Sequence, residues 1–347
     1  MAGEPITHRI FIERLVIAII VIGIALLLWN LRGLFLLVFG AALVSVILNI
    51  VAEPIRQRLN APDWLALLGA VVIVAGVIVA AFWTFGAQVT RQAQALSDMI
   101  PAAWTAMEAR LDAWGMGDAV REWTSGLRAG GGVVSNLGNI AVSVGNGIAD
   151  TLLVIVGGIY LAAQPELYRV GMIKLVPARG RALAAQAIEA SGRALRLWLL
   201  GRMVSMAVVG LLTWIGLMII GVPSALALGL IAALLEFVPF IGPIVAAVPA
   251  ILLAFAESPQ TAIWTALLFL AIQQLEGNVL EPLVQQRAVE MPPALLLFAL
   301  VAGGLVFGIV GIILAAPLTV VLFVLVKKLY VQEALHTETP LPGDEKH

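Results

Sequence analysis

The chain has no cysteine and few charged residues. Because cysteine is absent from all 347 positions, disulfides, thiolate metal sites and cysteine nucleophiles are excluded. The three histidines, His8, His336 and His347, lie in the two tails, which excludes a histidine-based centre within the apolar runs. Charged residues make up 12% of the chain, against about a quarter in soluble domains, and 61% of the chain is hydrophobic. These values are typical of an integral membrane protein.

Motifs of soluble enzymes and of nucleic-acid-binding proteins are missing as well. The net charge is −1, and no basic cluster carries interleaved aromatic residues, which excludes nucleic acid as a partner. The chain has no Gly-x-Ser-x-Gly elbow, no phosphate-binding glycine loop with lysine and no metal-ligand spacing. We therefore predict a protein that is not an enzyme and that binds no cofactor or metal.

Long uncharged runs predict the fold class. Residues 15–31 and 33–52 form a tight pair of apolar runs, and no cleavage site follows the first, so it is interpreted as a retained span. Two later runs, residues 203–235 and 291–326, would be ~50 Å and ~54 Å long as continuous helices, against a hydrocarbon core of about 30 Å. Each must bend, break or fold back. We predict an all-α polytopic transmembrane bundle with broken or re-entrant C-terminal helices.

Lysine and arginine residues set the expected orientation. Arg9, Arg14, Arg56, Arg58 and the basic stretch 165–202 belong in the cytoplasm under the positive-inside rule, which also places both termini there. The predicted regions are a three-span membrane region (1–90), an extracytoplasmic amphipathic segment (91–147), a fourth span (148–164), a basic cytoplasmic helical hairpin (165–202), a C-terminal transport bundle (203–330) and a cytoplasmic tail (331–347).

The extracytoplasmic segment has helical spacing. Trp104, Met107, Leu111 and Trp114 recur at intervals of three and four residues, so they share one face of a helix. This face either packs on its own subunit, lies at the level of the lipid headgroups, or contacts a ligand.

An acidic residue coincides with a helix break near residue 240. Pro239 and Pro243 cannot donate backbone hydrogen bonds, and Gly242 lies between them, so carbonyl groups are expected to be left unpaired there. Glu236 precedes this break by one turn. An acid at a break in lipid can neutralise a cation or carry a proton. The alternative is a kink whose glutamate pairs locally, for instance with Arg202.

A second polar group follows about thirty residues later along the chain. Its members alternate amides with carboxylates at helical spacing, so that they can ligate an ion or hydrogen-bond a hydroxylated solute. A polar loop at the membrane edge is the alternative. These residues are Gln273, Gln274, Glu276, Asn278, Glu281 and the following Pro282.

The last long run is rich in glycine and ends near a proline. Glycines at close spacing permit tight helix packing in lipid, and Gly303 with Gly304 can instead mark the tip of a re-entrant hairpin. The residues expected to shape the pathway here are Gly303, Gly304, Gly308, Gly311 and Pro317.

These three blocks, Glu236 to Pro243, Gln274 to Pro282 and Gly303 to Pro317, resemble the autoinducer-2 exporter family of bacterial permeases. The resemblance implies a permease of the inner membrane with about eight spans that exports a small molecule. It also implies a homo-oligomer, with a pentamer as one arrangement, and an elevator-like transport unit built from the broken helices.

The functional hypothesis is a secondary transporter. Glu236 and Glu276 would be the coupling or solute-binding acids, and Gln273, Gln274 and Asn278 would supply neutral oxygens. Proton or sodium coupling is expected at the same acids. A sodium/proton antiporter is the first alternative. A membrane scaffold that binds a cytoplasmic partner through residues 165–202 is the second.

Overall fold

The computed structural model describes residues 5–79, 149–282 and 291–336, and these ranges are helical without a strand. The predicted extracytoplasmic segment, including Trp104 and Trp114, lies outside the described residues. Four described helices are long and apolar enough to span a membrane, and a fifth span results if the bent pair after residue 148 counts as one. The all-α polytopic fold is therefore confirmed, whereas a total of eight spans stays a prediction.

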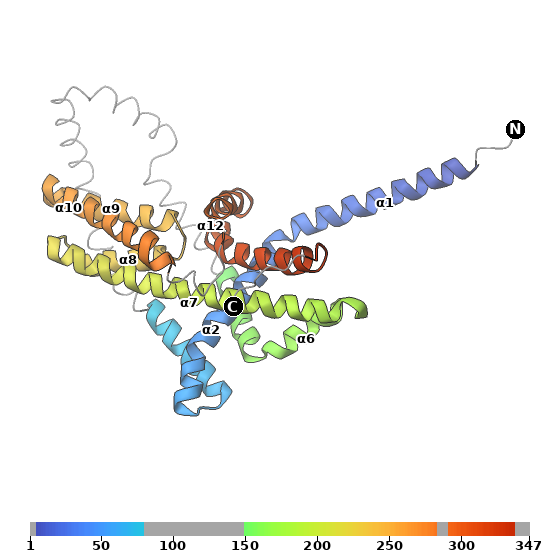
Figure 1. Ribbon diagram of the computed structural model, residues 1–347, viewed down its shortest axis with the longest axis horizontal. Coiled ribbons are helices and arrows are strands. Elements are labelled where there is room, and N and C mark those ends of the chain that lie inside the picture. Colours follow the sequence, from blue (N-terminus) through green and yellow to red (C-terminus); the bar gives the residue numbers. More distant parts are fainter. Residues whose placement is uncertain (1–4, 80–148, 283–290, 337–347) are drawn as a thin grey trace, which may run out of the picture.

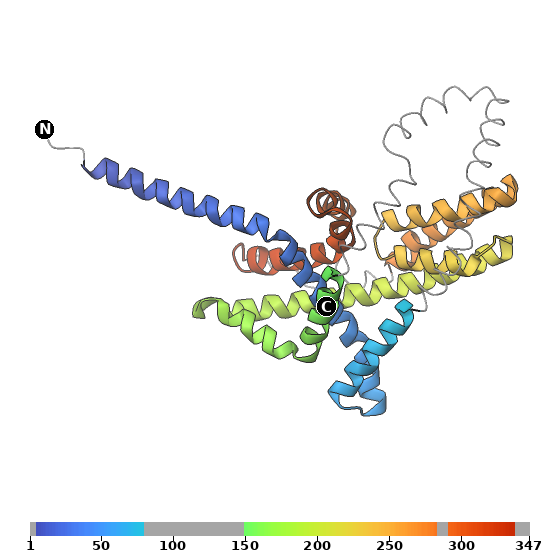
Figure 2. The same cartoon turned by 180° about the vertical axis from the view of Figure 1, so that it is seen from behind.

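Helices α1 (Pro5–Asn30) and α2 (Arg32–Leu59) open the chain. Helix α1 projects away from the remaining helices (Figures 1 and 2). Helix α2 ends at Leu59. The next residue, Asn60, adopts a left-handed conformation with φ 47°, and the chain then turns into the helix Asp63–Val79. Small residues of this helix, Ala66 and Ala70, pack in one apolar cluster with Leu48 and Ala52 of α2.

Helix α7 (Arg181–Ile220) is the longest element of the described chain and contacts most of the other helices. Its 40 residues span about 60 Å, twice the hydrocarbon thickness, so it extends well beyond the membrane. Before it, the helix Ala149–Ala163 meets α6 (Pro165–Leu175) at a bend of 93°, and the 3₁₀ turn η1 (Ala178–Gly180) leads into α7. The boundary expected at residue 202 lies inside the uninterrupted α7.

The first long C-terminal run folds back on itself. Gly221 ends α7 in the left-handed region (φ 87°), and α8 (Ala225–Leu235) returns along α7. A Cβ on Gly229 would lie 2.8 Å from the carbonyl oxygen of Gly210, so glycine allows the two backbones to approach closely. The expected interruption of residues 203–235 is therefore confirmed.

A second reversal follows α8. Helix α9 (Ile241–Glu257) packs on α8, and α10 (Pro259–Leu275) packs on both α9 and α7, so that α8, α9 and α10 gather beside the C-terminal half of α7 (Figure 1). Ser258 caps α10, since its hydroxyl accepts a hydrogen bond from the Thr261 backbone N–H at 3.0 Å. We call α8, residues 236–240 and α9 the first hairpin, and residues 236–240 its tip.

The last long run is also interrupted. Helix α12 (Pro293–Val326) is bent at Gly308, whose φ of 64° and ψ of −145° are not helical, and a π-helical turn, η3 (Lys327–Gln332), follows it. Gly303 and Gly311 lie against each other across the bend, so that a Cβ on Gly303 would lie 2.7 Å from the Gly311 carbonyl oxygen. The hypothesis that Gly303 and Gly304 form the tip is therefore wrong: the chain reverses at Gly308, and Gly303 serves the close packing of the two arms.

One apolar core joins α2, α7 and both arms of α12. The aromatic residues Phe237 and Phe240 of the first hairpin tip also pack against this core. Its fully or nearly buried members include Leu43, Ala194, Leu195, Leu199, Leu300, Leu314, Ala316, Val320 and Val324. The tip of the first hairpin is therefore held between α7 and α12.

Candidate functional site

A buried arginine of α7 connects three separate segments of the chain. Arg202 is only 9% exposed. Its Nη2 lies 2.8 Å from Oε1 of Glu236, and its Nη1 donates a hydrogen bond to Oε1 of Glu276 at 3.3 Å. Its Nε donates to the Phe237 carbonyl oxygen at 3.4 Å. One guanidinium thus ties α7 to the tip of the first hairpin and to the end of α10.

Glu236 is the most deeply buried acid of this group. It follows the last residue of α8 and is fully buried. Its distance from Arg202 makes an ion pair, but neither carboxylate oxygen accepts a hydrogen bond of good geometry within the described part of the chain. A buried carboxylate without aligned donors is costly as an anion. This favours any state in which Glu236 gains a proton or a cation.

The backbone beside Glu236 is strained. Phe240 has φ 64° and ψ −48°, and the Ile241 backbone N–H donates to the Pro239 carbonyl oxygen at 2.7 Å, which together form a γ-turn. A left-handed conformation of this kind is unfavourable for a residue other than glycine. Gly242 lies directly against the Leu235 carbonyl group and leaves no space for a Cβ atom. The tip is therefore a tightly determined turn and not a kinked helix.

The two prolines of the tip have different positions. Pro239 supplies the carbonyl oxygen of the γ-turn, whereas Pro243 lies in the first turn of α9, where a missing N–H leaves no hydrogen bond unmade. The expected loss of helical hydrogen bonds is therefore concentrated before Pro243, at residues 236–240. This segment is where backbone carbonyl groups are left outside regular helix.

Glu276 begins a π-helical turn, η2 (Glu276–Leu280), at the end of α10. It is 7% exposed, and its Oε2 accepts a hydrogen bond from Gln273 Nε2 at 3.4 Å. Asn278 Nδ2 donates to both the backbone and the side-chain oxygen of Gln274 at 2.9 Å, and this amide pair is exposed. The structure therefore separates the predicted amides: Gln273 contacts the buried acid, whereas Gln274 and Asn278 contact each other.

Glu281 adds a third carboxylate. It follows η2, and it interacts electrostatically with Glu276, Glu236 and Arg202. Pro282 comes next and ends this described range. We call these four ionisable residues the Arg202 cluster. If all are ionised, three carboxylates and one guanidinium leave an excess of two negative charges among the described residues. Glu236 and Glu276 are buried and pair with Arg202, whereas Glu281 is exposed.

The chemistry of the Arg202 cluster follows from this excess. Buried negative charge is unfavourable unless protons or cations neutralise it. Within the described ranges no three acidic or histidine side chains are arranged to hold a metal ion. The cluster is thus suited to exchanging a proton, or a cation that it holds through few ligands, with the surrounding solution.

Aromatic and apolar residues cover the cluster on its α12 side. Trp198 of α7 meets Phe237 edge to face, with ring centroids 6.0 Å apart. Phe307, next to the bend of α12, packs against the same core as Phe237 and Phe240. The predicted glycines of α12 therefore shape the helix that the tip contacts, and Pro317 lies fully buried within its second arm.

Two features of this site had weak signals or none in the sequence. Arg202 stands in a basic stretch, and only its position at the start of a long apolar run marks it as different from its exposed neighbours. The strained conformation of Phe240 has no signal in the sequence, because phenylalanine has no preference for positive φ.

Broken apolar helices that bring buried opposite charges together define a multi-pass membrane protein of the transporter class. Comparison with known proteins agrees. The model of the AI-2E family transporters matches residues 15–330, so the chain belongs to this family.

Several proteins that are similar to this chain are named as transport proteins. YueF of Bacillus subtilis is 30% identical over 194 residues, which cover 56% of this chain and 50% of YueF. YrrI of the same organism is 32% identical over 166 residues, which cover 48% of this chain and 47% of YrrI. The chain thus spans about half the length of these two relatives, whose names state no substrate. The AI-2 transport protein TqsA of Escherichia coli is 24% identical over 289 residues, 81% of this chain and 82% of TqsA.

Proposed function

We propose that this protein is a secondary transporter that exports a small polar molecule across the bacterial inner membrane in exchange for a proton or a sodium ion. The observation that carries this proposal is the Arg202 cluster, in which two buried carboxylates, Glu236 at the tip of the first hairpin and Glu276 at the end of α10, share one guanidinium. Coupling requires a buried site that changes its charge, and this cluster is such a site.

The coupling step starts at Glu236. When Glu236 or Glu276 gains a proton or a cation, its attraction to Arg202 weakens, and the tip of the first hairpin loses its strongest tie to α7. The strained γ-turn at Phe240 and the bend of α12 at Gly308 give the two broken helices conformations that depend on surrounding packing. We propose that the first hairpin and α12 then move together against α7, as an elevator-type unit.

The substrate class follows from the exposed amides and from the relatives. Gln274 and Asn278 present hydrogen-bonding groups beside the cluster, which suits a hydroxylated solute. TqsA is named an AI-2 transport protein and aligns with most of this chain. Autoinducer-2 is therefore the substrate to test first. We further propose that the protein acts as a homo-oligomer, with the pentamer as one arrangement, and that both termini are cytoplasmic.

Sodium/proton antiport is the second candidate. The excess of carboxylates over guanidinium in the Arg202 cluster favours it, because such a site exchanges cations without needing an organic solute. A sodium gradient alone would then drive proton movement.

Reconstituted liposomes distinguish these functions. Purified protein is reconstituted into liposomes that contain a pH-sensitive and a sodium-sensitive dye. Proton flux and sodium flux are then measured after a sodium gradient, an autoinducer-2 gradient or both are imposed. Export predicts proton or sodium flux only with autoinducer-2, whereas antiport predicts proton flux with sodium alone. Glu236→Gln and Glu276→Gln are expected to abolish either flux. Glu257→Gln, at the exposed end of α9, is the matched control.

Wild-type flux in both cluster variants would show that the cluster is architectural. Absence of any flux, together with binding of a cytoplasmic protein to residues 165–202, would support the scaffold alternative instead.

A further inference from the structure

A second charged site lies at the end of α2, and none of its lining residues belongs to the first hairpin. The end of α2, the start of the helix Asp63–Val79 and the bend between Ala163 and Pro165 enclose a half-open cavity of about 820 Å³. We call it the α2 cavity. Its size is that of a small-molecule site, and it shares no residue with the Arg202 cluster.

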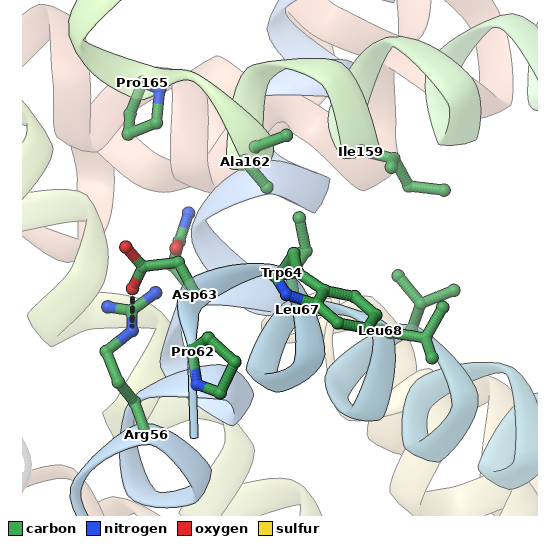
Figure 3. Close-up of a pocket in the computed structure, with 12 residues that line it drawn as sticks. Arg56, Pro62, Asp63, Trp64, Leu67, Leu68, Ile159, Ala162 and Pro165 are labelled. Atoms are coloured by element: carbon green, nitrogen blue, oxygen red, sulfur yellow. Dashed lines mark ion pairs between the residues drawn. The ribbon is translucent and has the colours of Figure 1, made fainter. Parts of the chain in front are cut away.

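The α2 cavity has a charged end and an apolar end. Figure 3 shows Arg56 paired with Asp63 at one end, and Leu68 and Ile159 toward the other. Trp64 lies between them and is 66% exposed. A ligand that fills the cavity must therefore be amphipathic, with a polar group at Arg56 and a hydrocarbon chain along Leu68 and Ile159.

The charges at the polar end favour a zwitterion over an anion. Arg56 Nε lies 2.7 Å from Asp63 Oδ1, and its Nη1 lies 3.3 Å from Glu53 Oε2, so one guanidinium faces two carboxylates. Nε is shielded from solvent yet makes no hydrogen bond of good geometry, so a better-aligned acceptor can replace Asp63. The Asp63 side chain is 86% exposed and can then pair with a cation.

The location of the α2 cavity matches that of a lipid headgroup. Arg56 follows the apolar part of α2, and Trp64 is of the type enriched where membrane and water meet. The 93° bend between the helix Ala149–Ala163 and α6 forms another wall. These features are those expected of a cavity whose charged end lies at the membrane surface and whose apolar end lies within the hydrocarbon.

We propose that the α2 cavity binds an amine-bearing zwitterionic phospholipid, such as phosphatidylethanolamine, with its phosphate on Arg56 and its ammonium on Asp63. One acyl chain lies along Leu68 and Ile159. A primary ammonium donates hydrogen bonds to the Asp63 carboxylate, which the quaternary ammonium of a choline lipid cannot do. A lipid with net negative charge is disfavoured by Asp63 and Glu53.

Native mass spectrometry of the full-length protein tests this proposal. The protein is equilibrated with equal amounts of phosphatidylethanolamine, phosphatidylcholine and phosphatidylglycerol, and the retained lipids are counted. Phosphatidylethanolamine is expected to exceed each of the others about two- to fivefold, the range that a partly exposed ion pair supports. Equal retention of the ethanolamine and choline lipids, preference for phosphatidylglycerol, or no retained lipid would each overturn the proposal.

Amino-acid substitutions test whether the retained lipid binds in the α2 cavity. Arg56→Gln and Asp63→Asn are expected to remove the preference, whereas Arg58→Gln, an exposed residue of the same helix end outside the cavity, retains it. Leu68→Trp fills the apolar end without touching either charge, and Ile73→Trp is its control on the exposed surface. Lipid retention in Leu68→Trp equal to that in Ile73→Trp would refute the site even if a charge variant failed to fold.

A soluble competitor separates a lipid from a free metabolite with the same headgroup. O-phosphoethanolamine carries both charges and no acyl chain, so it is expected to leave the lipid bound at millimolar concentration. Displacement at that concentration would show that the cavity recognises a soluble phosphoamine, against the proposal.

Discussion

Replacing Arg202 with glutamine tests whether the Arg202 cluster holds the first hairpin in place. Arg202 is 9% exposed, and its terminal nitrogens lie 2.8 Å from Glu236 and 3.3 Å from Glu276. Removing one partner of a buried ion pair destabilises a protein by about 3–5 kcal/mol, since the remaining charge is left uncompensated. We expect the free energy of unfolding of Arg202→Gln to fall by this amount, about a hundredfold or more in the ratio of folded to unfolded protein.

A second substitution tests the cause of that loss. Adding Glu236→Gln to Arg202→Gln removes one uncompensated charge, so the double variant is expected to recover about 0.5–3 kcal/mol, the coupling typical of contacting residues. Arg193→Gln is the matched control, because Arg193 lies on the same helix and pairs with Glu189 at 3.2 Å while 50% exposed. Its effect is expected to stay within about 0.5 kcal/mol.

The free energy of unfolding is measured by titrating sodium dodecyl sulfate into protein in mixed micelles, with helicity and tryptophan fluorescence followed together. Trp198 packs on Phe237 beside the cluster and is one of the nine tryptophans that contribute to this fluorescence. An Arg202→Gln protein as stable as Arg193→Gln would refute the reasoning. So would a double variant less stable than Arg202→Gln alone.

Two glycine substitutions test the broken helices. Gly242→Ala places a methyl group against the Leu235 carbonyl group. It is expected to lower the free energy of unfolding by about 1–3 kcal/mol and to reduce transport. The control is Gly33→Ala, because Gly33 is likewise the second residue of its helix and a Cβ atom there would meet nothing within 4 Å. Gly308→Ala is expected to cost about 1–3 kcal/mol in the same titration, because φ 64° with ψ −145° is accessible almost only to glycine, whereas Gly76→Ala meets nothing and changes little. An unchanged Gly308→Ala protein would show that the α12 bend is not fixed by its backbone.

Much of the fold was predictable from chain length and hydrophobicity. Residues 203–235 and 291–326 are apolar for longer than a membrane is thick, so covalent geometry alone required an interruption in each. The first interruption falls at Gly221, because a helix commonly ends at a glycine in the left-handed conformation. The position of the α12 bend was less determined, since several glycines compete within a few residues and packing of the arms selected Gly308.

The site was predictable in its parts but not in its assembly. Glu236 and Glu276 stood out as acids beside helix breaks, and Arg202 was one named partner for Glu236; the functional roles of all three stay predictions. That one guanidinium contacts both acids was not visible, because Arg202 and Glu276 are 74 positions apart. Gln273 and Glu276 lie three residues apart and Gln274 and Asn278 lie four apart, so both pairs have helical spacing. In the structure Gln273 contacts the buried Glu276 at the start of the π-helical turn, whereas Gln274 and Asn278 contact each other at the surface.

The sequence by itself determined that this is a polytopic helical membrane protein whose C-terminal spans are broken, because apolar length and the backbone limits of glycine and proline are local properties. Only the tertiary structure decided which charges meet, where α12 reverses and that Phe240 occupies a strained turn. Those outcomes depend on contacts between α7, the first hairpin and α12, and such contacts exist only once distant segments pack together.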